Sequence, residues 1–232
     1  TGSITFTGTA YRTNDTQAYN AGAATRTITL NENAVFITSD DNVTFTGLVE
    51  PQAANTETIS VTAGTGAVTF NQNVGAALAM GSFTIVSSAQ TDLANVIANG
   101  DIAVTGDNID LNSTTYASST SVTFTGEVDL TLAAGTTTVT SGGADTEDIT
   151  FTGAINDNSA GDTDLTLNAG ALGDVTINTI GVTTAIDDLD IDGLAISLNN
   201  IGSPGAASSG VVDVLGAAPG SITLTGTAYR TN

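Results

Sequence analysis

The sequence predicts an all-β fold, a β-solenoid with about ten rungs in the long repeat that spans residues 1–218. Three observations predict it: the composition favours strands and turns, a short alternating phrase recurs along the chain, and one segment stands near both ends in almost identical copies. A strand motif that recurs at near-constant spacing is expected to stack on copies of itself. A solenoid is therefore favoured over a meander of hairpins.

The composition lacks helix formers and is rich in strand and turn formers. Among 232 residues, Thr makes up nearly a fifth and Gly numbers 26, while Lys is absent, Arg is rare and Asp outnumbers Glu about four to one. Thr, Val and Ile favour strands because branching at Cβ suits the pleated backbone. Gly, Asn and Asp favour turns. No long apolar run of the kind that crosses a bilayer occurs, so no membrane-spanning segment is expected.

The residue types that are missing exclude several classes of function. Without Cys there is no disulfide, thiol nucleophile or cysteine-bound zinc, and without His there is no Ser-His-Asp triad or imidazole metal site. Without Lys there is no Schiff base and no Walker-type phosphate site. A formal net charge of −21 would repel nucleic acid, which needs cationic contacts to its phosphates.

The clearest internal repeat joins the two ends of the chain. Residues 2–14 read GSITFTGTAYRTN and residues 220–232 read GSITLTGTAYRTN, so 12 of 13 positions agree at an offset of 218. The single difference is Phe6 against Leu224. Chance explains such a match poorly, and a window of a longer repeating chain explains it well.

This repeat divides the chain into one long period, residues 1–218, and the start of the next, residues 219–232. The second copy of the first strand can extend the stack into a further period, either within one covalent chain or by strand exchange between subunits. The single Phe-to-Leu difference between the copies is typical of divergence between tandem repeats, so it favours one covalent chain over strand exchange between subunits. The residues expected to carry this self-assembly are Ile4, Phe6, Ile222 and Leu224.

A shorter phrase lies inside the period: an aliphatic residue, Thr, an apolar residue, Thr or another small polar residue, and often Gly. In a strand, its apolar residues point to one face and its Thr residues to the other. Stacked rungs would form inward columns of Val, Ile and Phe and outward ladders of Thr. The phrase begins at Ile4, Val43, Val68, Ile102, Val122, Ile149, Val175 and Ile222.

Phrases such as EDITFTGAINDN, DLTLNAG and GSITLTGTAYRTN give the chain a resemblance to a known family. Over essentially its whole length it resembles the repeat regions of filamentous-haemagglutinin-like bacterial exoproteins. The resemblance implies a right-handed parallel β-helix, secretion to the cell surface, and an adhesive or structural role. The N-terminal secretion module of that family has no counterpart in these residues.

The sharpest acidic cluster contains Asp188, Asp190 and Asp192. It matches the start of an EF-hand loop, but the twelfth loop position holds Asn199 where that loop needs Glu, and no flanking helices are visible. In a strand, the three carboxylates would share the outer face about 7 Å apart, and a hard cation would relieve their repulsion. We hypothesise a weak Ca²⁺ site at these residues, against the alternative of a solvated acidic edge. No other cofactor is expected.

Two further functions fit parts of the pattern less well. Outward Thr pairs on a flat face would resemble an ice-binding surface, but acidic and Asn residues interrupt the ladder. The pairs are Thr5/Thr7, Thr44/Thr46, Thr123/Thr125, Thr150/Thr152 and Thr223/Thr225. Polysaccharide processing would use paired acids, of which Asp107/Asp110 and Asp162/Asp164 are examples, but these are interpreted as turn residues. The tyrosines are interpreted as covers for the core whose hydroxyl groups face water.

The sequence as a whole predicts a non-enzymatic structural repeat of a secreted extracellular filament, sheath or adhesin stalk. The alternative is an adhesin segment that binds glycans or other surfaces through loops at residues 50–55 and 203–210. Residues 1–218 contain 24 acidic residues and two Arg, a charge of −22 per period, so periods should repel laterally unless screened. The partners expected are the chain itself, divalent cations and extracellular polysaccharide, without nucleic acid or membrane insertion.

Overall fold

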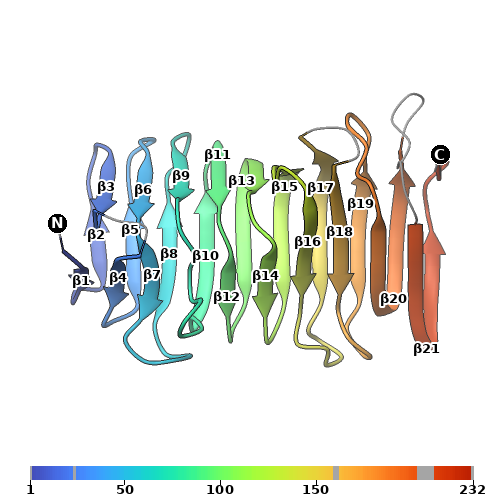
Figure 1. Ribbon diagram of the computed structural model, residues 1–232, viewed down its shortest axis with the longest axis horizontal. Helices are drawn as coiled ribbons and strands as arrows, with labels where there is room; N and C mark the ends of the chain where they lie inside the picture. Colours follow the sequence, from blue (N-terminus) through green and yellow to red (C-terminus); the bar gives the residue numbers. More distant parts are fainter. Residues whose placement is uncertain (1, 23–24, 159–161, 203–211, 231–232) are drawn as a thin grey trace.

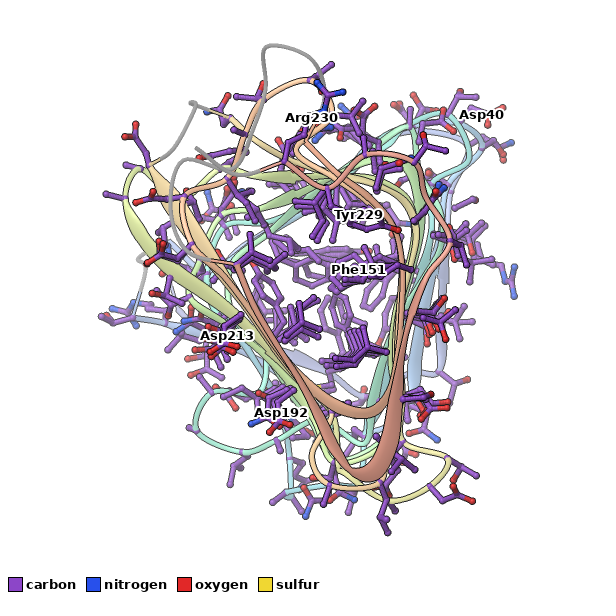
Figure 2. All side chains as sticks on the ribbon, turned by 90° about the vertical axis from the view of Figure 1, so that its right-hand side faces the viewer. Asp40, Phe151, Asp192, Asp213, Tyr229 and Arg230 are labelled. Carbon is purple, nitrogen blue, oxygen red and sulfur yellow. The ribbon has the colours of Figure 1, made fainter. Side chains whose placement is uncertain are left out.

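The prediction of an all-β solenoid is confirmed. The computed structural model describes residues 2–22, 25–158, 162–202 and 212–230, in which every regular element is a β-strand and all pairing is parallel. The strands stack side by side into a rod, with the two ends of the chain at opposite ends (Figure 1). Viewed along the axis, the coil is a triangle whose interior is filled by apolar side chains (Figure 2). Within the described ranges, no helix is long and apolar enough to cross a membrane.

Each coil contributes one strand segment to each of three faces, and the longer strands bend round a corner to serve two faces. Figure 2 views the rod from its C-terminal end. The chain passes from the lower left, where Asp192 lies, to the right, past Asp40 at the upper right, to the top, where Tyr229 lies. This path is counterclockwise towards the viewer, so the coil is right-handed.

The first face begins at the N-terminal end with a three-stranded parallel sheet and continues to the last coil through bridges at Val49, Val74 and Val96. Its strands are β1 (Ile4–Phe6), β4 (Thr27–Leu30), β7 (Leu48–Pro51), β12 (Val96–Ala98), β14 (Thr115–Ser118), β16 (Gly135–Thr140), β18 (Thr163–Asn168) and the first parts of β20 (Leu189–Ile201) and β21 (Val212–Leu224).

The second and third faces follow in the same order along the axis. The second face holds β2 (Ala10–Arg12), β5 (Ala34–Ile37), β8 (Thr58–Thr62), β10 (Ser82–Ser87), the first parts of β13 (Ile102–Leu111), β15 (Val122–Leu130), β17 (Ile149–Asp157) and β19 (Val175–Ile180), and the second parts of β20 and β21. The third face holds β3 (Gln17–Asn20), β6 (Val43–Thr46), β9 (Ala67–Phe70), β11 (Gln90–Leu93), the second parts of β13, β15, β17 and β19, and the end of β20.

Strand alternation creates the core, as the sequence predicts. In β15, Val122 and Phe124 are buried while Thr123 and Thr125 between them are partly exposed. Because the coils pair in register, each inward residue stacks on its counterpart in the next coil. The first-face column is Ile4, Ile28, Val49, Val74, Val96, Tyr116, Val139, Leu167, Ile191 and Val214.

The other two faces have matching columns, so three largely apolar stacks run the length of the rod. The second-face column is Tyr11, Phe36, Val61, Ile85, Val104, Phe124, Phe151, Ile177, Leu198 and Leu224. The third-face column is Gln17, Val43, Val68, Thr91, Ile109, Val128, Ile155, Ile180, Ile201 and Tyr229.

The coils differ in length, although their strands remain in register. The shortest step along the second-face column runs from Ile85 to Val104, and the longest runs from Phe124 to Phe151. The corners absorb the difference, because loops tolerate insertions that strands do not. The sequence predicts units of roughly 20–25 residues, and the observed spread is slightly wider.

Candidate functional site

A ladder of carboxylates lies on the outer side of the third face. Asp92 in β11 pairs with Asp110 in β13, and Asp110 pairs with Asp129 in β15. Neighbouring strands lie about 4.8 Å apart, so three like charges stand in a row across three coils. Thr69 precedes this acidic ladder and Asn156 follows it in the same outward column.

Polar side chains flank the acidic ladder and hold its carboxylates in place. The Asn108 Nδ2 group donates to Asp110 Oδ1 at 3.3 Å and to Gln90 Oε1 at 3.1 Å. The Thr69 hydroxyl donates to Asp92 Oδ2 at 3.2 Å, at the ladder's N-terminal end. Within the described residues, the Oδ1 atom of Asn108 is buried without a hydrogen-bond partner.

Burial and neighbouring negative charges make two members of the acidic ladder, Asp110 and Asp129, costly to ionise. Burial raises the pKa of Asp110 to about 6, and the negative charges of Asp92 and Asp129 add to the rise. Burial and the neighbouring charge of Glu127 raise the pKa of Asp129 as well. No cationic side chain offsets these charges, because the chain has only Arg12, Arg26 and Arg230, all outside the coils that carry the ladder.

The sequence pattern does not by itself reveal this ladder. The prediction that these acids lie in turns is wrong for Asp107, Asp110 and Asp164, because Asp107 and Asp110 lie within β13 and Asp164 lies within β18. A partial signal is the dipeptide Asp-Leu after a β-branched residue, which occurs at residues 91–93, 109–111 and 128–130 in the ladder and also at residues 163–165, on the first face. The Leu of each copy is buried, so the Asp before it must face outward.

The predicted calcium residues lie on a different face. Leu189 and Ile191 are buried, which places Asp188, Asp190 and Asp192 on the outer side of the first face, as the strand interpretation predicts. Asp190 pairs with Asp213 of the next coil. The side chains of Asp192 and Asp213 point away from the core at the left of the triangle (Figure 2).

Neither acidic group forms a metal centre by its own geometry. In the parts of the chain that the structure describes, no group of three or more Asp, Glu, His or Cys side chains is placed to hold a metal ion. Both groups offer only carboxylate and amide oxygens, the ligands of hard cations such as Ca²⁺. The calcium site at Asp188, Asp190 and Asp192 stays a prediction.

The outward Thr pairs do not share one face. Thr5 belongs to the first face, Thr44 to the third, and Thr123, Thr150 and Thr223 to the second. On the second face, this outward column also contains Val35, Ser60, Ala103 and Ser197. A mixed column of this kind lacks the regular Thr ranks that the ice-binding alternative needs.

A surface hollow lies at the corner between the second and third faces. Gly64, Thr65, Thr105, Gly106 and Asp107 line it, with neighbouring Ser and Thr side chains. Its titratable side chain is Asp107, a single carboxylate among Gly, Ser and Thr residues. The hollow therefore suggests no particular reaction.

The Gly of the TFTG phrase marks a corner where two coils approach closely. A Cβ atom at Gly126 would overlap the backbone carbonyl oxygen of Gly106, and one at Gly153 would overlap that of Gly126. At Gly226, the overlap would be with the carbonyl oxygen of Asn199. In each case the obstructing oxygen belongs to the preceding coil. The phrase therefore predicts a strand followed by a corner that packs closely against the backbone of the preceding coil.

Tyrosine side chains link some corners to the preceding coil through hydrogen bonds made inside the core. The Ser113 N–H group donates to the Tyr116 hydroxyl at 3.2 Å, and that hydroxyl donates to the Leu93 carbonyl of the preceding coil at 2.8 Å. Tyr116 is fully buried, and burial raises the pKa of its hydroxyl. The interpretation that the tyrosine hydroxyl groups face water is wrong for Tyr116.

The four predicted self-assembly residues lie at opposite ends of the rod. Ile4 and Phe6 belong to β1 on the first coil, where Phe6 is only 6% exposed. Ile222 and Leu224 belong to the end of β21 on the last coil, where they are 46% and 55% exposed. Both pairs lie on the inward side of their strands. Their unequal exposure shows that the last coil ends in an uncovered part of the core.

Of the two loops considered for binding, the first is held by the coil that follows it. The buried Glu50 carboxylate accepts hydrogen bonds from the Ala77 N–H at 3.1 Å and the Leu78 N–H at 2.9 Å. Glu50 thus fixes a neighbouring loop and is not displayed to a ligand. The second loop, residues 203–210, lies outside the described residues.

Comparison of the chain with protein-family models, with curated proteins and with solved structures finds no match to any of them.

Proposed function

We propose that the chain is a non-enzymatic structural repeat of a secreted extracellular filament, sheath or adhesin stalk, extended by stacking coils end to end. The observation that carries the proposal is the continuity of the three inward columns from the first coil to the last. The second-face and third-face columns finish there in the exposed side chains of Leu224 and Tyr229, with Ile222 exposed beside them. Such an end buries apolar surface and pairs its free backbone groups when a further coil covers it.

The proposed partner is more of the same chain. A tandem covalent polypeptide supplies the next coil directly, because residues 220–232 repeat residues 2–14. The likeness to filamentous-haemagglutinin-like exoproteins agrees with a cell-surface location and supports this proposal. Divalent cations and extracellular polysaccharide are the proposed lateral partners, since a period carries a charge of −22.

Glycan binding through loops is the second candidate, and it is less well supported. Its first loop begins at Glu50, whose buried carboxylate is bound to the loop of the following coil, while residues 52–55 are exposed. A structural role needs no displayed loop and uses the whole length of the rod.

Association of the rods tests the proposal. The 232-residue chain is expected to form single rods about 45–50 Å long at low concentration and longer end-to-end stacks as concentration rises, seen by electron microscopy and sedimentation. Leu224→Asp is expected to abolish the stacks. Leu172→Asp is the matched control, because Leu172 is 51% exposed but lies in a loop away from the ends.

Two results would contradict the proposal. One is a chain that remains a single rod at every concentration while antibodies against it label no surface filaments on the source cell. The other is equal loss of association in both variants. The mass of the native material in denaturant separates covalent tandem copies from exchanged subunits: a mass many times that of the present chain indicates one polypeptide, and a mass near 23.0 kDa indicates subunits.

A further inference from the structure

The two copies of the repeated segment, residues 2–14 and 220–232, lie on different faces of the rod. Ile4 pairs with Ile28 on the first face, whereas Ile222 pairs with Ile196 on the second. The first-face position of the last coil is filled by Val214, which stands nine coils after Ile4 in the same column. The offset between the copies therefore spans nine coils and one face, not a whole number of coils.

Both copies nevertheless form the same local structure. The Gly8 N–H group donates to the Tyr11 hydroxyl at 2.8 Å, and the Gly226 N–H group donates to the Tyr229 hydroxyl at 2.8 Å. This bond joins neighbours within the segment, so it does not depend on which corner of the triangle the segment occupies. The segment is a strand and corner that fits more than one corner of the coil.

The second copy shows contacts for which the first copy has no neighbour. The Tyr229 hydroxyl donates to the Leu198 carbonyl of the preceding coil at 3.2 Å, and the Arg230 N–H donates to the Ile201 carbonyl at 3.0 Å. Tyr11 has the same hydroxyl, but within the described residues no coil precedes it to supply a carbonyl. Gly8 likewise has no backbone atom of a preceding coil near its Cβ position.

We propose that the first coil receives the end of a preceding period, and that each period joins the next after a rotation of about a third of a turn about the fibre axis. The occupant is the set of strands equivalent to residues 196–201 and 212–214 of the period before. The last coil displays this junction already, since residues 222–230 stack on residues 196–201 there. The inference rests on the proposed function, because it presumes that periods follow one another.

The rotation distributes surface features around the fibre. The acidic ladder of Asp92, Asp110 and Asp129 lies on the third face of one period, on the first face of the next and on the second face of the one after that. Three periods bring it back to the starting side. A filament built in this way is acidic on every side and gathers cations all round, which suits a fibre surrounded by matrix better than a sheet packed on one side.

Engineered disulfides test the rotation in the present chain, which contains no Cys to interfere. Ser197 and Thr223 are outward partners on the second face, so S197C with T223C is expected to form a disulfide in most molecules. Asp192 is the control, because it stands in the outward first-face column that Thr5 begins. If the repeat spanned a whole number of coils, Thr223 would lie beside Asp192 on the first face. Under the proposed rotation the two residues lie on different faces, so D192C with T223C is expected to keep both thiols free.

Intact mass after thiol alkylation counts the remaining thiols. A disulfide in D192C/T223C, equal yields in the two pairs, or free thiols in both pairs would each overturn the rotation. The rod-association measurement is a separate readout. If the rods stack although S197C/T223C stays reduced, the proposed structural function stands and the rotation is contradicted. If the disulfide forms but the rods never associate, the rotation stands and the proposed structural function is contradicted.

Discussion

The two ends of the rod carry almost the same sequence in opposite situations. The first copy has a coil after it, and the second has a coil before it. Phe6 of the first copy is 6% exposed and touches the rings of Tyr11, Tyr19 and Phe36 at centroid distances of 4.6, 4.9 and 5.1 Å, while Leu224 of the second copy is 55% exposed. The burial of a side chain in this fold is therefore set by its neighbours along the axis as much as by its own segment.

The first prediction exploits this difference in burial. Phe6→Ala is expected to destabilise the chain by about 3–5 kcal/mol, because it removes a buried ring from an aromatic cluster. Leu224→Ala is expected to cost about 1 kcal/mol, because its side chain is half in water already. Urea unfolding followed by circular dichroism measures both. Equal losses would show that the two ends do not differ in the way described.

Glycines give the next largest effect and isolate the role of the preceding coil. The pentapeptide ITFTG occurs at residues 4–8 and again at residues 149–153, but only Gly153 has a backbone carbonyl of a preceding coil in the space of a Cβ atom. Gly153→Ala is expected to cost about 1–3 kcal/mol through overpacking. Gly8→Ala is expected to cost clearly less, because the nearest atom to its Cβ is the Tyr11 hydroxyl oxygen at 3.1 Å, the end of a side chain that needs to shift by only a few tenths of an ångström. Urea unfolding measures both, and equal losses would contradict the role given to the preceding coil.

Gly226→Ala completes this glycine series. It should loosen the last coil, because its Cβ would overlap the Asn199 carbonyl oxygen. Hydrogen exchange of the last coil reports this opening, which global unfolding can miss in a stacked protein. Equal protection in G226A and the parent chain would contradict the account of the corner.

The middle of the rod differs from both ends in carrying the acidic ladder, and pH exposes that difference. Folded Asp110 has a pKa of about 6, against about 4 in an unfolded chain, so the folded chain binds the extra proton between these values. The contribution of protonated Asp110 to the free energy of unfolding is therefore fully present below about pH 4 and is lost as the pH rises through about 6. The melting temperature is expected to rise when pH is lowered from 7 to 5.

Asp110→Asn is the matched variant for the pH prediction. It is expected to melt higher than the parent at pH 7 and to show a smaller gain on acidification, as followed by calorimetry at both pH values. Asp15→Asn, in an exposed bend directly after the first copy, should leave the pH response unchanged. A pH response that survives in D110N would place its origin elsewhere.

The smallest expected effect comes from the tyrosine hydroxyl groups. Tyr229→Phe removes two hydrogen bonds, one accepted from the Gly226 N–H and one donated to the Leu198 carbonyl. Tyr11→Phe removes only the hydrogen bond that the Tyr11 hydroxyl accepts from the Gly8 N–H. The expected difference is about 0.5–1.5 kcal/mol, the net worth of one hydrogen bond. Hydrogen exchange at the two end coils is the measurement. A greater loss in Y11F would contradict the view that the first copy awaits a partner.

The sequence predicts the fold class well because the fold follows from local chemistry. Alternation in segments such as Val122–Thr125 determines which side chains face inward, and recurrence of the phrase indicates parallel stacking. The same alternation also predicts the outward placement of Asp190 and Asp192, which the structure shows.

The phase of the repeat could not be predicted from the sequence. Coils differ in length, as the steps from Ile85 to Val104 and from Phe124 to Phe151 show, so counting along the chain does not tell which face a phrase occupies. The phrase at residues 43–47 lies on the third face and the one at residues 122–126 on the second, although both read VTFTG. The acidic ladder depends on this same information, since its carboxylates meet only when the register of three coils is known.

A structure of a chain with two complete periods, residues 1–218 followed by residues 1–232, tests the central claim most directly. Electron cryomicroscopy is expected to show one continuous rod in which the second period is displaced by about 45 Å and rotated by about a third of a turn relative to the first. In that rod, Tyr11 of the second period should donate its hydroxyl to the Leu198 carbonyl of the first. Periods that superimpose by translation alone, or a break in the strand stack at the junction, would contradict the account.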